Sequence, residues 1–220
     1  MAVRRVLADE RVDVLLEAFA SGAVEPGSGA FAALSAATGA ALVATVARRS
    51  LRSVEAGVAS RMHEIAGEAD AARPVLLSLA DRDAEAHRAV MEAYHALRAE
   101  PDDGLDARTA RLHVVQEALE DAVDVQLDLA RRAVFLTGLA EEATAGGDPN
   151  AVAEGVSAAA ALHAAAVAAL ATVELNAFAI VDDGRRAELT DTCESLRARA
   201  TQMLDDARGA FVRRVSVATT

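Results

Sequence analysis

Asp83 and His87 are the residues whose types and spacing most directly suggest chemistry. They stand four positions apart in the segment LSLADRDAEAHRAVMEAYHAL, which is expected to be helical. Residues at this spacing share one helix face and come within hydrogen-bonding reach. A carboxylate beside an imidazole orients the ring and stabilises its cation, which suits proton transfer near neutral pH. A surface pair that adds only a little helix stability is the alternative interpretation.

A turn of small residues, Pro26-Gly27-Ser28-Gly29, precedes a stretch without charge between Ala30 and Ala47. The glycines predict a tight turn with positive-φ positions. The helix that follows would present unpaired backbone N–H groups and a partial positive charge, which an anionic or electron-rich ligand can approach closely. We therefore expect Pro26, Gly27, Ser28 and Gly29 to bind substrate, although such turns also precede ordinary buried helices.

A second glycine-rich turn covers residues 146–150, and Glu154 follows in the first turn of another apolar helix. We expect both turns to face one cleft, with Asn150 binding substrate. A half-buried Glu154 carboxyl in that cleft would serve as an acid or base. The alternative is an acid that only complements the helix dipole.

Two polar residues on predicted helices complete the candidate site. The guanidinium of Arg111 suits bidentate contacts with a planar carbonyl or a carboxylate, although an exposed helix arginine would have the same sequence context. Asn176 carries an amide on an otherwise apolar helix and must find a partner, either a ligand or a neighbouring helix. His163, on the same helix, is interpreted as a core histidine.

The first two of these segments resemble the cyclodeaminase/cyclohydrolase family. The turn at 26–30 is similar to its P-G-G-G-S pattern, with Ser28 in place of the middle glycine and Ala30 in place of the serine. Residues 83–87 resemble D-A-x-A-aromatic, with His87 at the aromatic position. A lysine that often follows A-Y in the family is replaced by His95.

The resemblance extends over roughly residues 7 to 205. The helix that begins near Arg111 is similar to R-x-x-x-x-Q-x-A-L-x-x-A, with Gln126 where the family has a proline. Further along, Ala153 and Thr172 replace a serine and an asparagine of the family patterns. Glu154 replaces an aspartate, and Asn176 is retained.

The resemblance implies an all-helical homodimer with folate bound in a groove between subunits. It also implies an enzyme that acts on one-carbon tetrahydrofolates, either hydrolysing the methenyl group or closing the formimino group with loss of ammonia. Catalytic roles would fall to Asp83, His87 and Glu154, with a tetrahydrofolate derivative as substrate and no covalently bound cofactor. Because four polar groups of the family patterns are missing, two alternatives stay open: an iminium-type (Mannich-like) cyclisation in secondary metabolism, and a non-catalytic helical dimer.

Composition limits the remaining function classes. A net charge of −12 disfavours nucleic-acid binding. The chain contains no lysine, so Schiff-base chemistry on a lysine is excluded. No metal-binding motif occurs, and the single cysteine, Cys193, favours a cytoplasmic protein. The apolar stretches 30–47 and 155–173 approach membrane-spanning length, but they are rich in alanine, and we expect no membrane partner.

The chain reads as one all-α domain over residues 1–220, a bundle of six or seven helices with its core at 7–205 and a frayed tail at 206–220. Hydrophobic residues make up 53% of the chain and aromatic ones only 3%, so alanine must fill the core. Helices are expected at 5–20, 30–52, 54–99, 106–145, 151–181 and 185–210. The third should end or kink at Pro74, and the fourth should be capped by Asp106 and end near residue 145. The helices at 30–52 and 151–181 are expected to be buried on all sides, which favours homodimerisation through their faces.

Overall fold

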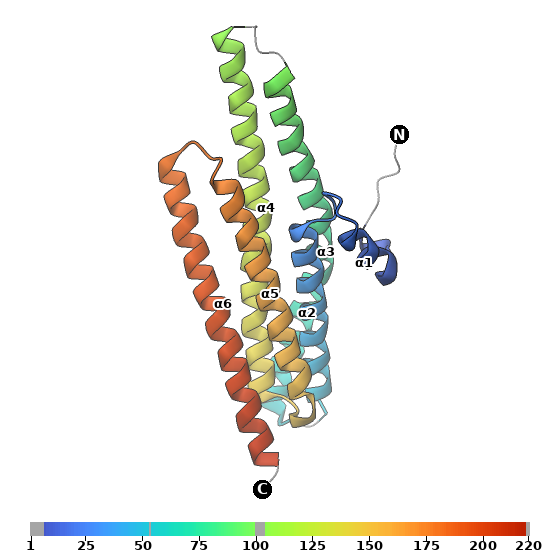
Figure 1. Cartoon of the computed structure of the whole chain (residues 1–220). Coiled ribbons are helices and arrows are strands. Elements are labelled where there is room, and N and C mark those ends of the chain that lie inside the picture. The colour runs from blue at the N-terminus through green and yellow to red at the C-terminus, as the bar shows by residue number, and fades with distance from the viewer. Residues whose placement is uncertain (1–6, 53, 100–103, 219–220) are drawn as a thin grey trace.

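The computed structural model describes residues 7–52, 54–99 and 104–218, and the secondary structure in these ranges is helical throughout. The described residues form five long helices. These helices run roughly along one axis, and the short helix α1 lies beside the bundle (Figure 1). The elements, in chain order, are η1 (Leu7–Asp9), α1 (Val12–Ala20), α2 (Ser28–Ser50), α3 (Ala56–Ala99), α4 (Leu105–Gly146), η2 (Pro149–Ala151), α5 (Val152–Ala177) and α6 (Asp183–Ala218). The predicted all-α fold is confirmed.

Helix α4 is the centre of the bundle, because it packs against α2, α3, α5 and α6. Helices α2 and α5 also pack against each other, α2 further contacts α3, and α5 further contacts α6. Small side chains allow this close packing: a Cβ atom added at Gly39 of α2 would lie 2.5 Å from Cγ of Leu162 on α5. The alanine-rich sequence therefore produces a core in which helix backbones approach one another closely.

The expectation that α2 and α5 are buried on all sides is wrong for the single chain. Each helix leaves one stripe of residues exposed. On α2 the exposed residues include Phe31, Thr38 and Thr45. On α5 the stripe, here called the α5 stripe, is made of Ala153, Ser157, Ala160, Ala164, Val167, Ala171 and Leu175. By length and composition both α2 and the segment Pro149–Ala177 could cross a membrane, a test that core helices of soluble proteins also pass.

Several predicted boundaries need correction. The helix predicted at 54–99 is present as α3, and of the predicted end or kink at Pro74 only the end is wrong, because this proline lies inside the helix. The ring removes one backbone hydrogen bond, while Leu76 and Leu79, both fully buried, anchor the next turns in the core. Helix α6 runs to Ala218, so residues 206–218 are helical rather than frayed.

The other boundary corrections concern helix ends. Asp106 lies in the first turn of α4, and Gly104, with a φ of +92°, is the N-cap. The predicted helix at 5–20 is divided into η1 and α1, and the one at 151–181 ends at Ala177. The predicted loop at 100–103 lies outside the described residues.

The contact of Gly39 with Leu162 gives a stability prediction. Gly39→Ala should destabilise the protein by up to about 2 kcal/mol, because overpacking costs about 1–3 kcal/mol and the better helix propensity of alanine returns about 1 kcal/mol. Urea denaturation followed by circular dichroism measures this change. The matched control is Gly67→Ala on α3, where an added Cβ meets nothing within 4 Å and should stabilise the protein. Equal effects of the two changes would contradict the packing argument.

Candidate active site

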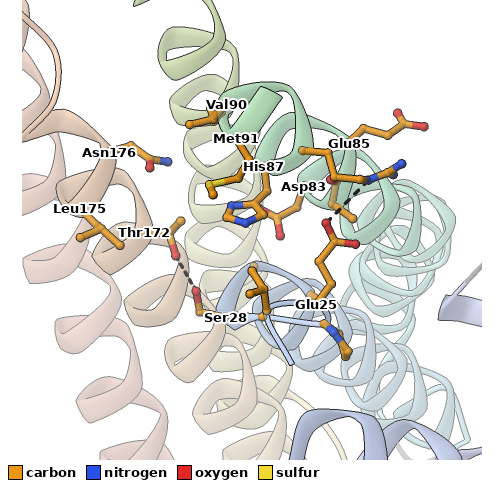
Figure 2. A pocket seen from close by; sticks show the side chains of 18 of the residues that line it. Glu25, Ser28, Asp83, Glu85, His87, Val90, Met91, Thr172, Leu175 and Asn176 are labelled. Carbon is orange, nitrogen blue, oxygen red and sulfur yellow. Dashed lines mark hydrogen bonds and ion pairs between the residues drawn. The ribbon is translucent and has the colours of Figure 1, made fainter. Parts of the chain in front are cut away.

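A cavity of about 860 Å³ opens where the start of α2 meets the middle of α3 and the end of α5. Figure 2 shows Asp83 and His87 from α3, Ser28 from α2, and Thr172 and Asn176 from α5 arranged around this space. The cavity brings together seven of the ten predicted site residues, namely Pro26, Gly27, Ser28, Gly29, Asp83, His87 and Asn176.

The first glycine turn contributes a close contact. Gly27 is the N-cap of α2 with φ −108° and ψ −161°, and positive φ among the described residues occurs only at Gly22 and Gly104. The predicted positive-φ turn is therefore wrong. Gly29 has a different role, since a Cβ added there would lie 2.3 Å from the carboxyl group of Asp83. Glycine at position 29 lets the first turn of α2 lie directly against that carboxyl group.

The surroundings of Asp83 shift the pKa of its carboxyl group. Burial raises the pKa of the Asp83 carboxyl, and nearby Glu25 raises it further. A hydrogen bond from Gln126 and the charge of His87 lower it, but burial is the larger effect. Gln126 Nε2, on α4, donates to Asp83 Oδ1 at 2.5 Å. A carboxyl group whose charged form is disfavoured holds its proton to higher pH, as a general acid or base near neutral pH requires.

His87 lies one turn after Asp83 on the same helix and faces the same cavity (Figure 2). Its Nε2 atom is buried and has no hydrogen-bond partner among the described residues. Buried polar atoms are usually satisfied by protein or water. The unpaired nitrogen beside the cavity is therefore available to a ligand or a water molecule, and the predicted Asp83–His87 pair faces a cavity instead of open solvent.

Two hydroxyl side chains of the cavity wall are in contact with each other. Ser28 Oγ lies 2.9 Å from Thr172 Oγ1, which ties the start of α2 to α5. The Thr172 hydroxyl also donates to the carbonyl of Ala168 at 3.2 Å. The hydroxyl pair places two polar groups at the cavity wall, where Asn176 is a further neighbour.

The charge of the cavity wall is mainly negative. The acidic residues that line it are Glu25, Asp81, Asp83 and Glu85, and the cavity also has apolar walls that include Met91 and Tyr94. Among the lining residues Arg88 carries the one permanent positive charge, and its Nε lies 3.6 Å from Glu25 Oε1. This balance favours a ligand that carries positive charge at its reacting centre.

Glu154 and Asn150 lie at the other end of the bundle. Glu154 forms an ion pair with Arg49, whose Nη2 also donates to the carbonyl of Asn150 at 3.0 Å. Along α5 the rise from Glu154 to Thr172 is about 27 Å. The expectation that both glycine turns face one cleft is wrong within one chain, because α2 and α5 are antiparallel and their N-termini lie at opposite ends.

Arg111 is also outside the cavity. It lies on α4, two turns before the lining residue Leu119. Gln116, on the same helix, holds the connection after α5, since its Nε2 donates to the carbonyl of Ala179 and its Oε1 accepts from the N–H of Val181. His163 lies 3.3 Å from Thr201 Oγ1, and burial lowers its pKa. No cluster of three potential metal ligands occurs in the part of the chain that the structure describes.

The sequence pattern of a family described as formiminotransferase-cyclodeaminase matches residues 11–195. The chain belongs to this family. A methenyltetrahydrofolate cyclohydrolase of Methylorubrum extorquens is 31% identical over 197 residues, which cover 87% of this chain and 91% of that protein. A crystal structure of formiminotetrahydrofolate cyclodeaminase from Thermotoga maritima matches with a TM-score of 0.82 at 23% identity, covering 95% of this chain and 99% of that one. The structural likeness supports the fold, and the predicted membership of a cyclodeaminase/cyclohydrolase family is confirmed.

Burial of Asp83 gives a pH-dependent stability prediction for this family member. Its pKa is raised in the folded protein, so folding disfavours the charged form, and this cost is fully present above the folded pKa. Asp83→Asn should therefore raise the Tm at neutral pH, and the gain should shrink as the pH falls through the raised pKa. Thermal denaturation of both proteins between pH 4 and pH 8 measures this difference, with the exposed Asp106→Asn as control. A destabilised Asp83→Asn protein at neutral pH would contradict the argument.

Proposed function

We propose that this protein is an enzyme of one-carbon tetrahydrofolate chemistry that opens or closes the carbon bridge between two nitrogens of a tetrahydrofolate. The observation that carries the proposal is the placement of the half-buried Asp83 carboxyl and the His87 imidazole in one acidic cavity. Family membership and the names of both relatives support the same class of reaction.

The chemistry fits a cavity with excess negative charge. A methenyl carbon between two nitrogens carries positive charge, which carboxylates nearby stabilise. In the hydrolytic direction water adds to this carbon, a base takes the proton of the water, and a nitrogen receives a proton as its bond to carbon breaks. In the deaminating direction a nitrogen attacks the formimino carbon and ammonia leaves with a proton. Either reaction needs one proton-transfer pair, which Asp83 and His87 supply.

The cavity also has the size and polarity for such a substrate. A volume of about 860 Å³ lies within the usual range of small-molecule sites. Its apolar walls suit a flat ring, and Ser28, Thr172 and Asn176 provide hydrogen-bonding groups at one side. The N-terminus of α2 adds backbone N–H groups next to Ser28.

A homodimer would complete the site. The two predicted groups of site residues lie near opposite ends of α2 and α5, and the α5 stripe connects them on the surface. A two-fold axis perpendicular to α5 near Ala164, midway along the α5 stripe, would place the partner's Glu154 and the partner's Asn150 beside this chain's Thr172. The exposed alanines of the stripe allow close helix contact, and exposed Leu175 would be covered. In this arrangement Glu154 acts across the subunit boundary.

Hydrolysis of methenyltetrahydrofolate is the direct test. Its near-ultraviolet absorbance disappears when the ring opens, so we expect decay that scales with enzyme concentration. Asp83→Asn and His87→Gln should each lower kcat by about 10²–10⁴-fold, the usual contribution of general acid–base catalysis. The control is His113→Gln, which changes an exposed histidine on α4 paired with Glu117.

Three outcomes are informative. Loss of absorbance with the wild type and with His113→Gln, but not with Asp83→Asn or His87→Gln, supports the hydrolase direction. Turnover of formiminotetrahydrofolate alone assigns the deaminating direction. A folded protein that converts neither substrate contradicts the proposal and favours iminium-type cyclisation or a non-catalytic dimer. The cyclisation is the stronger alternative because Ala30, Ala153 and Thr172 depart from the family patterns while the cavity of this chain is acidic and could stabilise an iminium ion.

Mixing two inactive variants tests whether the site is shared between chains. If Asp83 acts with the partner's Glu154, Asp83→Asn and Glu154→Gln are each inactive, but their heterodimer contains one intact site. Equal mixing with free subunit exchange should then restore about one quarter of the wild-type activity, as two-fold symmetry requires. Activity of the mixture and its mass by light scattering measure the effect.

The Ala164→Arg change is the control for subunit pairing. It places two arginines near the proposed axis, so variants that carry it should be monomeric and should show no restored activity. If the Glu154→Gln protein is fully active, Glu154 has no role in catalysis. A monomeric wild-type protein would contradict the shared site.

A further inference from the structure

Gln126 is an unusual residue for its position. It is fully buried in α4, with Val125 and Leu127 as buried neighbours in the sequence. The buried polar residues in the described part of the chain are Gln126 and three hydroxyl residues, Ser50, Thr137 and Thr144. Each hydroxyl donates to a carbonyl of its own helix, four residues earlier. Gln126 is the exception, since its side chain reaches across to another helix.

The amide of Gln126 is committed to Asp83. Its Nε2 atom donates to Asp83 Oδ1 at 2.5 Å, and its Oε1 atom is buried without a hydrogen-bond partner among the described residues. A buried acceptor without a donor costs free energy, and an apolar side chain of the same shape would avoid that cost. The glutamine therefore carries a free-energy cost at Oε1, and the contact that it makes in return is with the cavity acid.

We propose that Gln126 is a positioning residue for Asp83, whose amide holds the carboxyl group at the cavity in both of its protonation states. This inference rests on the proposed acid–base role of Asp83. With the charged form, Nε2–H donates to a carboxylate oxygen, as in the structure. With the protonated form, a half-turn about the Cγ–Cδ bond presents Oε1, which accepts from the carboxyl O–H. The same side chain thus supports Asp83 before and after proton transfer.

The packing around Asp83 makes such support necessary. Gly29 of α2 contacts the carboxyl group from one side, and Gln126 of α4 holds it from another. Neither Gly29 nor Gln126 brings a charge to the Asp83 carboxyl group. The charges that act on Asp83 are His87 on the same helix and Glu25 in the turn before α2. Asp81, Glu85 and Arg88 line the same cavity.

The test is Gln126→Met, which keeps the length and approximate volume of the side chain and removes the amide. The hydrogen bond of the amide to the charged carboxylate is stronger than its bond to the protonated carboxyl group, so loss of the amide should raise the pKa of Asp83 further. A carbon-detected NMR titration of the Asp83 carboxyl group measures this directly. The Tm at neutral pH should fall, because the charged Asp83 carboxyl group loses its donor and its cost to folding grows.

Activity gives the second measurement. Gln126→Met should lower kcat/KM by about 10- to 100-fold, as expected for a misplaced catalytic group, and should shift the acidic limb of its pH profile to higher pH. In an Asp83→Asn background the same change should have no further effect on kcat/KM. The matched control is Thr137→Val, a buried polar residue of α4 that bonds only within its helix. It should leave the titration of Asp83 unchanged.

The outcomes separate this proposal from the proposed function. An unaltered or lowered pKa of Asp83 in Gln126→Met overturns the positioning role. A further loss of activity in the Asp83→Asn background also overturns it. If the wild type does not convert a folate, the proposed function fails, but the NMR titration still decides the role of Gln126. If Gln126→Met does not fold, Gln126→Leu replaces it, and failure of both to fold would make Gln126 a structural residue and overturn the proposal.

Discussion

The close approach of helix backbones is the constraint on which this structure depends. Alanine and glycine cover the facing sides of α2 and α5, and Gly39 leaves no room for an additional carbon next to Leu162. Such packing buries little apolar area per residue, so it requires long helices and many contacts. The two helices are antiparallel, so the N-terminus of α2 lies beside the end of α5. The cavity is located at this junction.

The same use of small residues reappears at the chemical centre. Gly29 brings the backbone of α2 against the Asp83 carboxyl group, and burial then disfavours its charge. At the other end of α2, Gly147 packs beside Ser50, whose hydroxyl accepts a hydrogen bond from the N–H of Asp148 at 2.7 Å. Two similar turns thus have different roles, one in the cavity and one in joining helices.

The sequence predicts the all-α fold and the placement of Asp83 and His87 on one helix face, for identifiable physical reasons. Helix periodicity and the lack of strand patterns fix an all-α bundle, and the spacing of Asp83 and His87 fixes their common face. Neither pattern predicts whether two helices far apart in the sequence pack parallel or antiparallel. For that reason Glu154 is expected in the cavity but lies at the opposite end of α5. Gln126 is visible as a departure from a pattern, but only the structure shows that its amide reaches Asp83.

The poverty of aromatic residues has a spectroscopic consequence. The chain contains no tryptophan and a single tyrosine, Tyr94, which lines the cavity. All intrinsic fluorescence at wavelengths longer than that of phenylalanine therefore comes from this one side chain at the wall of the candidate site. A bound pteridine absorbs in the range where tyrosine emits, so it would quench this one fluorophore by energy transfer. The protein thus contains its own optical sensor of site occupancy, and no label has to be introduced.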